Sequence, residues 1–158
     1  MKQSAGILLY RKVNTYPEFF LVHPGGPFFM RKNEGWWTIP KGEFTAEETA
    51  LTAAVREFRE ETGYTPEGEF TALEPVRQKG GKLVYGWAAE GDLDPGQLVS
   101  NTFEMIWPPR SGKLKTFPEI DLGAWFGYAE AVRMINTSQA AFIEELYRLK
   151  EWEREQTA

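Results

Sequence analysis

A start signal and a stop signal for one α-helix stand in residues 45–63, and they constrain the fold more than any other feature of the chain. Thr45-Ala46-Glu47-Glu48 has the Thr-x-x-Glu pattern of a capping box, in which the Thr hydroxyl and the Glu carboxylate bond free backbone N–H groups. Gly63 tolerates the left-handed conformation that often ends a helix. The sequence therefore predicts a helix that begins near Ala46 and ends at Thr62.

This helix has an apolar side and an acidic side. One apolar stripe is expected to face the core: Leu51, Val55, Phe58 and Thr62. Three carboxylates point off another side, away from the core, at spacings i, i+3 and i+4: Glu57, Glu60 and Glu61. Like charges one turn apart repel by roughly 0.2–0.5 kcal/mol per pair, and only Arg56 stands close by to offset them. Such a cluster is either a solvated surface or a set of hard oxygen ligands for Mg²⁺ or Mn²⁺.

Apolar runs on both sides of this helix predict strands, and they fall at residues 4–10, 17–23, 36–39, 68–77, 82–89 and 102–107. Residues 138–152 return to helical spacing, with Ala141, Leu146 and Leu149 on the side expected to pack. These elements indicate an α+β fold, an α/β/α sandwich with a central mixed β-sheet and a C-terminal packing helix. The 158 residues suit a single domain over 1–158.

Composition excludes several classes of protein. The chain has no cysteine, which excludes disulfides, cysteine-bound zinc and a thiol nucleophile. A hydrophobic share of 42% excludes a disordered chain, and a net charge of -5 disfavours binding to duplex nucleic acid. No apolar run is long enough for a signal peptide or a membrane span, so we expect no membrane association and a cytoplasmic location.

The whole segment 42–64 resembles the signature of the Nudix hydrolase family: Gly, five residues, Glu, seven residues, then Arg-Glu-apolar-x-Glu-Glu-x-Gly-apolar. Every fixed position matches, and the matching residues are Gly42, Glu48, Arg56, Glu57, Glu60, Glu61 and Gly63. Phe58 and Tyr64 fill apolar positions where the family more often has aliphatic residues. The resemblance implies the Nudix-type sandwich and a hydrolase that uses Mg²⁺ or Mn²⁺ to cleave a nucleoside diphosphate linked to another group.

The resemblance also implies roles for particular residues. It implies metal ligation by the carboxylates of Glu57, Glu60 and Glu61 and by the backbone carbonyl of Lys41, with Arg56 as an orienting charge. Glu119 stands about six residues before Trp125, and the family often has a further glutamate at that place. We therefore expect Glu119 among the metal ligands and catalytic residues, with Asp121 and Glu104 as lesser candidates. The catalytic base stays open among the four glutamates.

Substrate contacts are expected from Trp37, from the side chain of Lys41 and from the basic residues Arg110 and Lys113. Trp36-Trp37-Thr38-Ile39-Pro40-Lys41-Gly42 resembles the lead-in of the family branch that hydrolyses diadenosine tetraphosphate. The expected partner is a small nucleotide, first a dinucleoside polyphosphate. Oxidised nucleoside triphosphates, nucleotide sugars, RNA 5′ ends and a non-catalytic nucleotide-binding role are the alternatives. We expect a monomer or homodimer, and we expect His23 to satisfy a local hydrogen bond.

Overall fold

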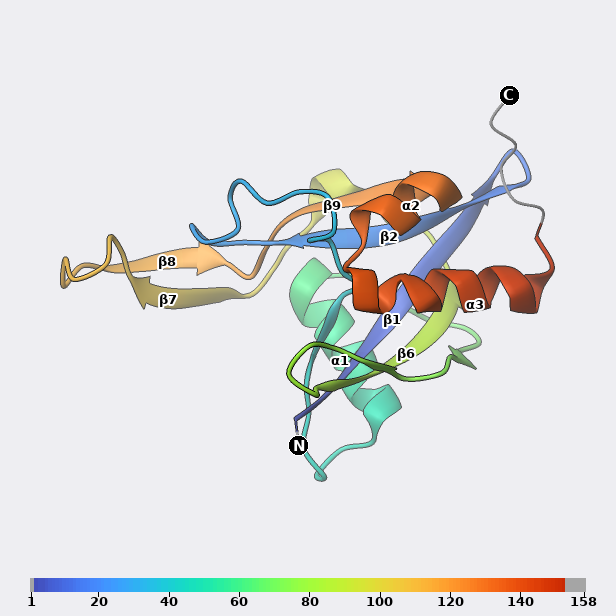
Figure 1. Cartoon of the computed structure of the whole chain (residues 1–158), viewed down its shortest axis with the longest axis horizontal. Coiled ribbons are helices and arrows are strands. Elements are labelled where there is room, and N and C mark those ends of the chain that lie inside the picture. Colours follow the sequence, from blue (N-terminus) through green and yellow to red (C-terminus); the bar gives the residue numbers. More distant parts are fainter. Residues whose placement is uncertain (1, 153–158) are drawn as a thin grey trace.

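The computed structural model describes residues 2–152, and a seven-stranded mixed sheet lies at its centre (Figure 1). Its strands are β1 (Gln3–Val13), β2 (Tyr16–Pro24), β3 (Lys41–Glu43), β4 (Thr71–Ala72), β5 (Val76–Arg77), β6 (Leu83–Glu90) and β9 (Ile120–Gly127). The order is β4-β6-β1-β2-β9, with β3 paired to β1 and β5 paired to β6. Only the β1–β6 pair is parallel among these strand pairs, so the sheet is mixed as predicted.

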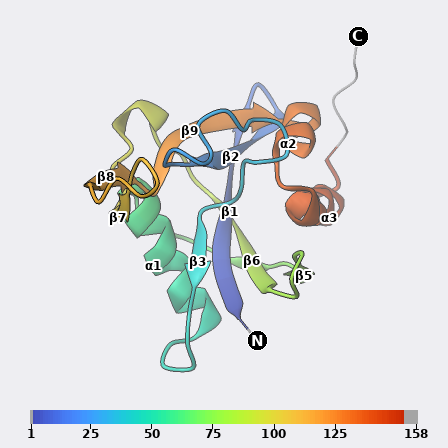
Figure 2. The ribbon, with the colours of Figure 1, turned by 60° about the vertical axis from the view of Figure 1, so that its left-hand side comes forward.

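Helices cover both faces of the sheet. The helix α1 (Ala50–Thr62) lies on one face, and α2 (Tyr128–Met134) and α3 (Ala140–Lys150) lie on the other (Figure 2). Two short 3₁₀ helices span Pro95–Gln97 and Thr137–Gln139. This arrangement confirms the predicted α/β/α sandwich. No helix within residues 2–152 has the length and apolar character needed to cross a membrane.

Side-chain alternation along β1 divides the core into two layers, because neighbouring residues of a strand point to opposite faces. Toward α1, the strand contributes Ala5, Ile7 and Leu9, which pack with Phe58 of the helix. Toward α2 and α3, it contributes Leu8 and Tyr10, which pack with residues such as Leu146. Both layers are fully formed, so α1 is held by a core of its own.

The start of α1 differs from the prediction, which was wrong by four residues. The N-cap is Thr49, whose Oγ1 accepts a hydrogen bond from Thr52 N at 3.2 Å. Thr45 Oγ1 instead accepts from Glu47 N at 3.3 Å within a turn. Glu48 cannot complete a capping box, because its carboxylate is bound by Arg56. The predicted end at Gly63 is confirmed, with φ 83° in the left-handed region.

The buried side of α1 also differs from the predicted stripe. Ala53, Ala54, Phe58, Glu61 and Thr62 are buried, whereas Leu51 and Val55 are only half-buried. Small alanine side chains let the helix approach β1 and β3 closely. As a result the acidic side is turned partly toward the sheet and not wholly away from the core.

Three further expectations need correction. Residues 36–39 form only isolated bridges, Val22 with Thr38 and Trp37 with Ile135, and not a strand. The stretch 68–77 divides into the two short strands β4 and β5. In α3 the buried residues are Phe142, Ile143, Leu146 and Tyr147, while Ala141 and Leu149 are exposed.

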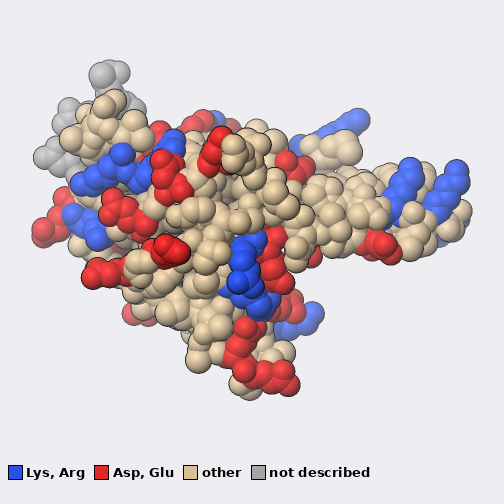
Figure 3. All heavy atoms as spheres, turned by 180° about the vertical axis from the view of Figure 1, so that it is seen from behind, with Lys and Arg blue, Asp and Glu red and all other residues tan. Residues whose placement is uncertain are grey.

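A separate hairpin of β7 (Thr102–Ile106) and β8 (Leu114–Pro118) projects from the body of the molecule (Figures 1 and 3). The sequence predicted a strand over 102–107, which holds β7, but predicted none at β8. Most β8 side chains are exposed, so no apolar run marks the strand. The hairpin leads directly into β9, and Glu119 is the residue between them.

Candidate active site

The carboxyl groups of Glu57 and Glu61 in α1 lie against the first two residues of β3, Gly42 and Lys41. Lys41 N donates a hydrogen bond to Glu61 Oε1 at 3.3 Å. The Glu57 carboxyl group lies directly on Gly42, where any Cβ would overlap with it. A side chain at position 42 would therefore displace the Glu57 carboxyl group. The structure therefore brings Lys41, Glu57 and Glu61 together.

Burial changes the acidity of these two carboxyl groups. Glu61 is only 9% exposed, and burial raises its pKa to about 8. Lys41 opposes this rise, while the negative charges of Glu57 and Glu119 add to it. Burial also raises the pKa of Glu57, and the hydrogen bond from Arg56 opposes that rise. Burial thus disfavours the charged form of both carboxyl groups, and a bound cation would favour that form.

Arg56 is the organising cation on the other side of the cluster. Its Nη2 donates to Glu48 Oε1 at 2.6 Å, and its Nη1 donates to Glu57 Oε1 at 2.9 Å and Glu60 Oε2 at 2.6 Å. The bond to Glu48 is the largest of the effects that raise the pKa of Arg56 above its usual value, and it keeps the pKa of Glu48 low. Arg56 thus holds three glutamates in one ion-pair network.

Glu119, between β8 and β9, is linked to the end of α1 through the backbone of Asn101. Its N donates to Asn101 O at 2.8 Å, and its carbonyl accepts from Gly25 N at 2.8 Å. Asn101 N in turn donates to Glu60 O at 2.8 Å. The Glu119 charge raises the pKa of both Glu57 and Glu61, so it lies within electrostatic reach of them.

The lesser candidates lie in other surroundings. Asp121 binds His23 Nδ1 at 2.8 Å, so its carboxylate is engaged away from the glutamate cluster. Glu104 stands in β7 opposite Thr116 and is exposed. His23 is buried and bonded through both ring nitrogens, which confirms the expectation of a local hydrogen-bonding role.

The substrate role predicted for Trp37 does not fit its position. The ring is 6% exposed, packs against His23 and Phe126, and donates from Nε1 to Asn33 Oδ1 at 3.0 Å. The exposed ring is that of its neighbour Trp36, at 41%. Backbone bridges on both sides of residue 37 turn its side chain into the core.

Of the three basic residues predicted to contact the substrate, one lies at the site and two lie away from it. Lys41 is at the site, and burial lowers the pKa of its ammonium group, with the nearby charge of Lys82 adding to the effect. Arg110 and Lys113 are exposed in the turn of the projecting hairpin, and Figure 3 shows basic side chains gathered at the far end of this projection. The hairpin carries both residues away from α1, so they do not join the cluster in this structure.

A cavity of about 690 Å³ is lined by residues that include Trp36, Arg77, Lys79 and Ser138, and none of the four predicted ligand glutamates lines it. The turn that supplies Gln78 to this lining is linked to β3, because Gln78 N donates to Lys82 O at 2.8 Å and Lys82 Nζ pairs with Glu43 at 3.2 Å. Sequence reasoning missed Lys82 and Trp36. The only signal for Lys82 is its place after the Gly80-Gly81 turn, and the pairing of β6 with β1 brings it near β3.

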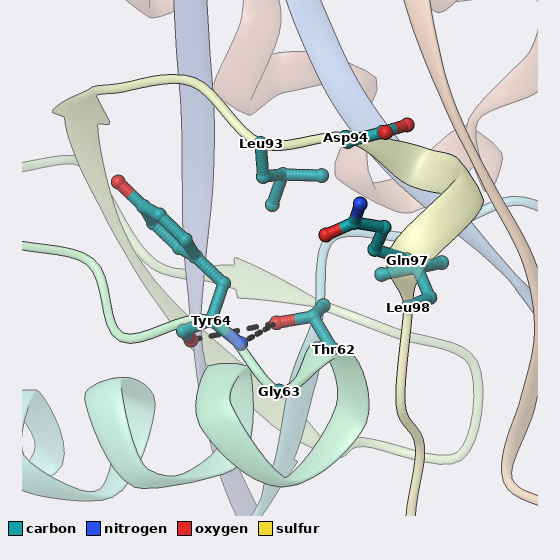
Figure 4. A pocket seen from close by; sticks show the side chains of 7 residues that line it. All are labelled: Thr62, Gly63, Tyr64, Leu93, Asp94, Gln97 and Leu98. Atoms are coloured by element: carbon teal, nitrogen blue, oxygen red, sulfur yellow. Dashed lines mark hydrogen bonds between the residues drawn. The ribbon is translucent and has the colours of Figure 1, made fainter.

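A smaller cavity of about 190 Å³ lies at the C-terminal end of α1 (Figure 4). Figure 4 shows Thr62, Tyr64 and Gln97 among its lining side chains, with Thr62 Oγ1 bonded to the backbone of Tyr64. None of the residues that line it is basic. It therefore lacks the groups that would hold a phosphate.

The chemistry of the acidic cluster suits a divalent cation, since carboxylate and carbonyl oxygens are the ligands that Mg²⁺ and Mn²⁺ prefer. Within residues 2–152, however, no three His, Cys, Asp or Glu side chains are placed to hold a metal as they stand. Arg56 binds the carboxylates of Glu57 and Glu60 in this arrangement. A metal would therefore need these two side chains to turn away from Arg56.

Comparison with known proteins places the chain in a family. The NUDIX domain model matches residues 2–146, and the chain belongs to this family. The 8-oxo-(d)GTP phosphatase of Mycolicibacterium smegmatis is 38% identical over 81 residues, a match that covers 46% of this chain and 23% of that protein. The chain thus spans less than a quarter of the length of this curated relative.

Two solved structures share the fold. A Caenorhabditis elegans Ap4A hydrolase, solved as a binary complex, superimposes with a TM-score of 0.64 at 21% identity, covering 94% of this chain and 98% of that one. The NUDIX domain of Shewanella oneidensis NrtR, solved with ADP ribose, gives a TM-score of 0.61 at 16% identity, covering 94% and 87%. At these identities the likeness concerns the fold alone.

Proposed function

We propose that the chain is a divalent-metal-dependent Nudix pyrophosphohydrolase that cleaves a nucleoside diphosphate linked to another group. The observation that carries this proposal is the set of α1 carboxylates fixed against Lys41 and Gly42, in a chain that belongs to the NUDIX family. The Glu61 carboxyl group, with a pKa near 8, is buried beside a second acidic side chain, and ionising it there costs stability unless a positive charge is bound. A bound cation would offset this cost.

The carboxylates of Glu57, Glu60, Glu61 and Glu119, with the carbonyl of Lys41, would hold Mg²⁺ or Mn²⁺. When bound, the metal supplies neutralisation of pyrophosphate charge and a water of lowered pKa. A glutamate of the four that faces the attacking water accepts its proton, and which one does so stays open.

The charged residues around the cluster position these groups and the substrate. Arg56, anchored by Glu48, orients the carboxylates of Glu57 and Glu60 until a metal replaces it as their partner. Lys41 and Lys82 offer ammonium groups to phosphate oxygens on the side of the large cavity. Trp36 offers an exposed aromatic face for a nucleobase, a contact worth roughly 1–3 kcal/mol per base.

We propose a nucleoside polyphosphate as substrate, with a dinucleoside tetraphosphate as the first choice. The sequence lead-in to Gly42 supports it, and a cavity of about 690 Å³ next to Lys82 has room for a nucleoside. A cytoplasmic location and a monomeric or homodimeric state remain predictions from the sequence.

Clean-up of oxidised nucleoside triphosphates is the second candidate. The relative from Mycolicibacterium smegmatis is named for this substrate class, and its identity to the matched part of the chain is 38%. A nucleotide-binding role without catalysis is less favoured, because all the box carboxylates are present. Nucleotide sugars and RNA 5′ ends are the remaining alternatives.

The test is a substrate panel with Mg²⁺ or Mn²⁺ and identification of products. ATP plus AMP from diadenosine tetraphosphate would support the first choice, and a nucleoside monophosphate plus pyrophosphate from an oxidised triphosphate would support the second. Glu60→Gln is the matched control, with a rate expected to fall by about two orders of magnitude or more at unchanged folding. Absence of turnover with every nucleotide would overturn the proposal.

A further inference from the structure

The buried His23 ties β2 to the start of β9 and to the loop that follows β2. Its Nδ1 lies 2.8 Å from Asp121 Oδ1 at the start of β9. Its Nε2 lies 2.6 Å from Lys32 O, in the loop that follows β2. The ring is 4% exposed and packs edge-on to Trp37, with 5.4 Å between ring centroids. Both polar atoms of the ring are therefore used, and the ring has one fixed orientation.

Asp121 is the extra residue of a β-bulge. His23 pairs with Leu122, whereas Pro24 pairs with Ile120, so Asp121 has no partner of its own on β2. A bulge of this kind changes the direction of the side chains beside it. Here it places Asp121 next to His23 and sets the course of the chain at Glu119, two residues earlier.

The backbone of Glu119 is fixed from both sides of this bulge. On the β2 side, Gly25 N donates to its carbonyl, and a Cβ at Gly25 would collide with Pro118 O. On the other side, its N donates to Asn101 O, and Ile120 N donates to Ser100 Oγ at 3.0 Å. Within residues 2–152, the His23–Asp121 contact is the only side-chain link between β2 and the bulge residue.

We infer that His23, through Asp121, is a positioning residue that sets the place of the Glu119 carboxylate relative to Glu57 and Glu61. This inference rests on the proposed function, because it assumes that Glu119 takes part in metal binding. His23 itself touches neither the glutamate cluster nor the substrate cavity. It acts only by holding the bulge.

Two variants of His23 separate its two hydrogen bonds. Asn places its amide nitrogen near the position of His Nδ1, so His23→Asn can still donate to Asp121. Gln places its amide nitrogen near the position of His Nε2, so His23→Gln can still donate to Lys32 O. A positioning role through Asp121 predicts that the Asn variant keeps the function and that the Gln variant loses it.

The experiment is a double-mutant cycle on Mn²⁺ affinity, measured by titration of the purified full chain. Replacing a residue that orients a ligand typically costs about 10–100-fold in metal affinity. We expect His23→Gln and Glu119→Gln each to weaken Mn²⁺ binding about tenfold, and the double variant to be no weaker than either one, because coupled residues are not additive. His23→Asn should stay within about threefold of the wild type.

A control variant excludes a general loss of stability. Ile143→Val removes one methyl group from the core beside α3, at a cost of about 0.5–1.5 kcal/mol, far from the bulge. Combined with Glu119→Gln, it should give additive effects. Thermal unfolding of all variants shows that they are folded at the assay temperature.

The inference is overturned if the His23→Gln and Glu119→Gln effects multiply, or if the Asn and Gln variants of His23 lose the same affinity. It is also overturned if Glu119→Gln leaves Mn²⁺ affinity unchanged, a result that would still leave the α1 glutamates as ligands. By contrast, a wild-type chain that binds Mn²⁺ but cleaves no nucleotide would overturn the proposed reaction. The double-mutant cycle on Mn²⁺ affinity would still test the role of His23.

Discussion

The helix α1 and the β7–β8 hairpin both carry charged residues that the sequence assigned to the site, but only α1 is held by a core. Phe58 of α1 is fully buried, and Glu61 beside it is nearly so. In the hairpin, Ile106 and Leu114 are 42% and 61% exposed although they face each other across the strands. Packing against the core fixes the positions of the charged side chains of α1, whereas no such packing fixes those of the hairpin.

Glu60 and Glu61 show the same contrast at the scale of one residue. The Glu60 side chain is 33% exposed and pairs with Arg56. The Glu61 side chain points toward β3, accepts from Lys41 N and has its pKa raised by burial. Rotation by one helical position thus separates a surface ion pair from a buried acid.

The largest expected effect is on stability, from truncation of the α1 anchor. Phe58→Ala should lower the free energy of unfolding by about 3–5 kcal/mol, because it removes a fully buried ring. Phe103→Ala in the half-buried hairpin should cost only about 1 kcal/mol. Urea unfolding of both variants measures the difference, and equal losses would show that the hairpin is packed as firmly as α1.

The next effect concerns Gly42. A methyl group there would displace the Glu57 carboxyl, so Gly42→Ala should lower the proposed turnover about 100-fold, the usual cost of a displacement near 1 Å. Gly96→Ala is the matched control, because its Cβ would meet only the Asp94 side chain, at 3.2 Å. Steady-state kinetics of the two variants would contradict the account if Gly42→Ala kept wild-type activity.

Glu61 should give a pH-dependent stability in the metal-free protein. Its folded-state pKa, about 8, lies above the ordinary value of 4.5, so its stabilising neutral form is fully present at low pH and is lost as pH rises through 8. Relative to Glu61→Gln, the wild type should therefore lose stability between about pH 4.5 and 8, by at most about 1.4 kcal/mol per pH unit. Denaturant unfolding in chelator tests this, and a difference that stays constant with pH would refute it.

The smallest effect is expected at the hairpin turn. Replacing Arg110 and Lys113 together by Ala should change kcat/KM by less than about twofold, because exposed charges act weakly beyond about 8–10 Å at physiological salt. A tenfold rise in KM in the same assay would show that these two residues contact the substrate, as the sequence predicts.

The spacing of residues along the sequence predicted the acidic side and the end of α1. It failed for features that depend on contacts between distant segments. The carboxylates of α1 and the end at Gly63 follow from helical periodicity and glycine chemistry. Thr45 and Thr49 both suit a helix cap, and the Glu48–Arg56 ion pair removes the carboxylate that the first would need. Trp36 and Trp37 are alike as residues, and only backbone bridges to β2 and to Ile135 show which one is buried.

Glu119 shows the limit most clearly. Its expected role came from a resemblance, and its approach to Glu57 and Glu61 depends on the β2–β9 pairing and on Asn101. The spacing of the sequence predicts neither the bulge at Asp121 nor the contact between Asp121 and His23. Both require knowledge of which strands are neighbours.

The central claim is that the α1 carboxylates form a divalent-cation site, and Mn²⁺ titration of the wild type and of Glu57→Gln measures it directly. We predict saturable binding to the wild type, and at least tenfold weaker binding to the variant at an unchanged melting temperature. Equal affinity of the two proteins, or no binding to the wild type, would contradict the account.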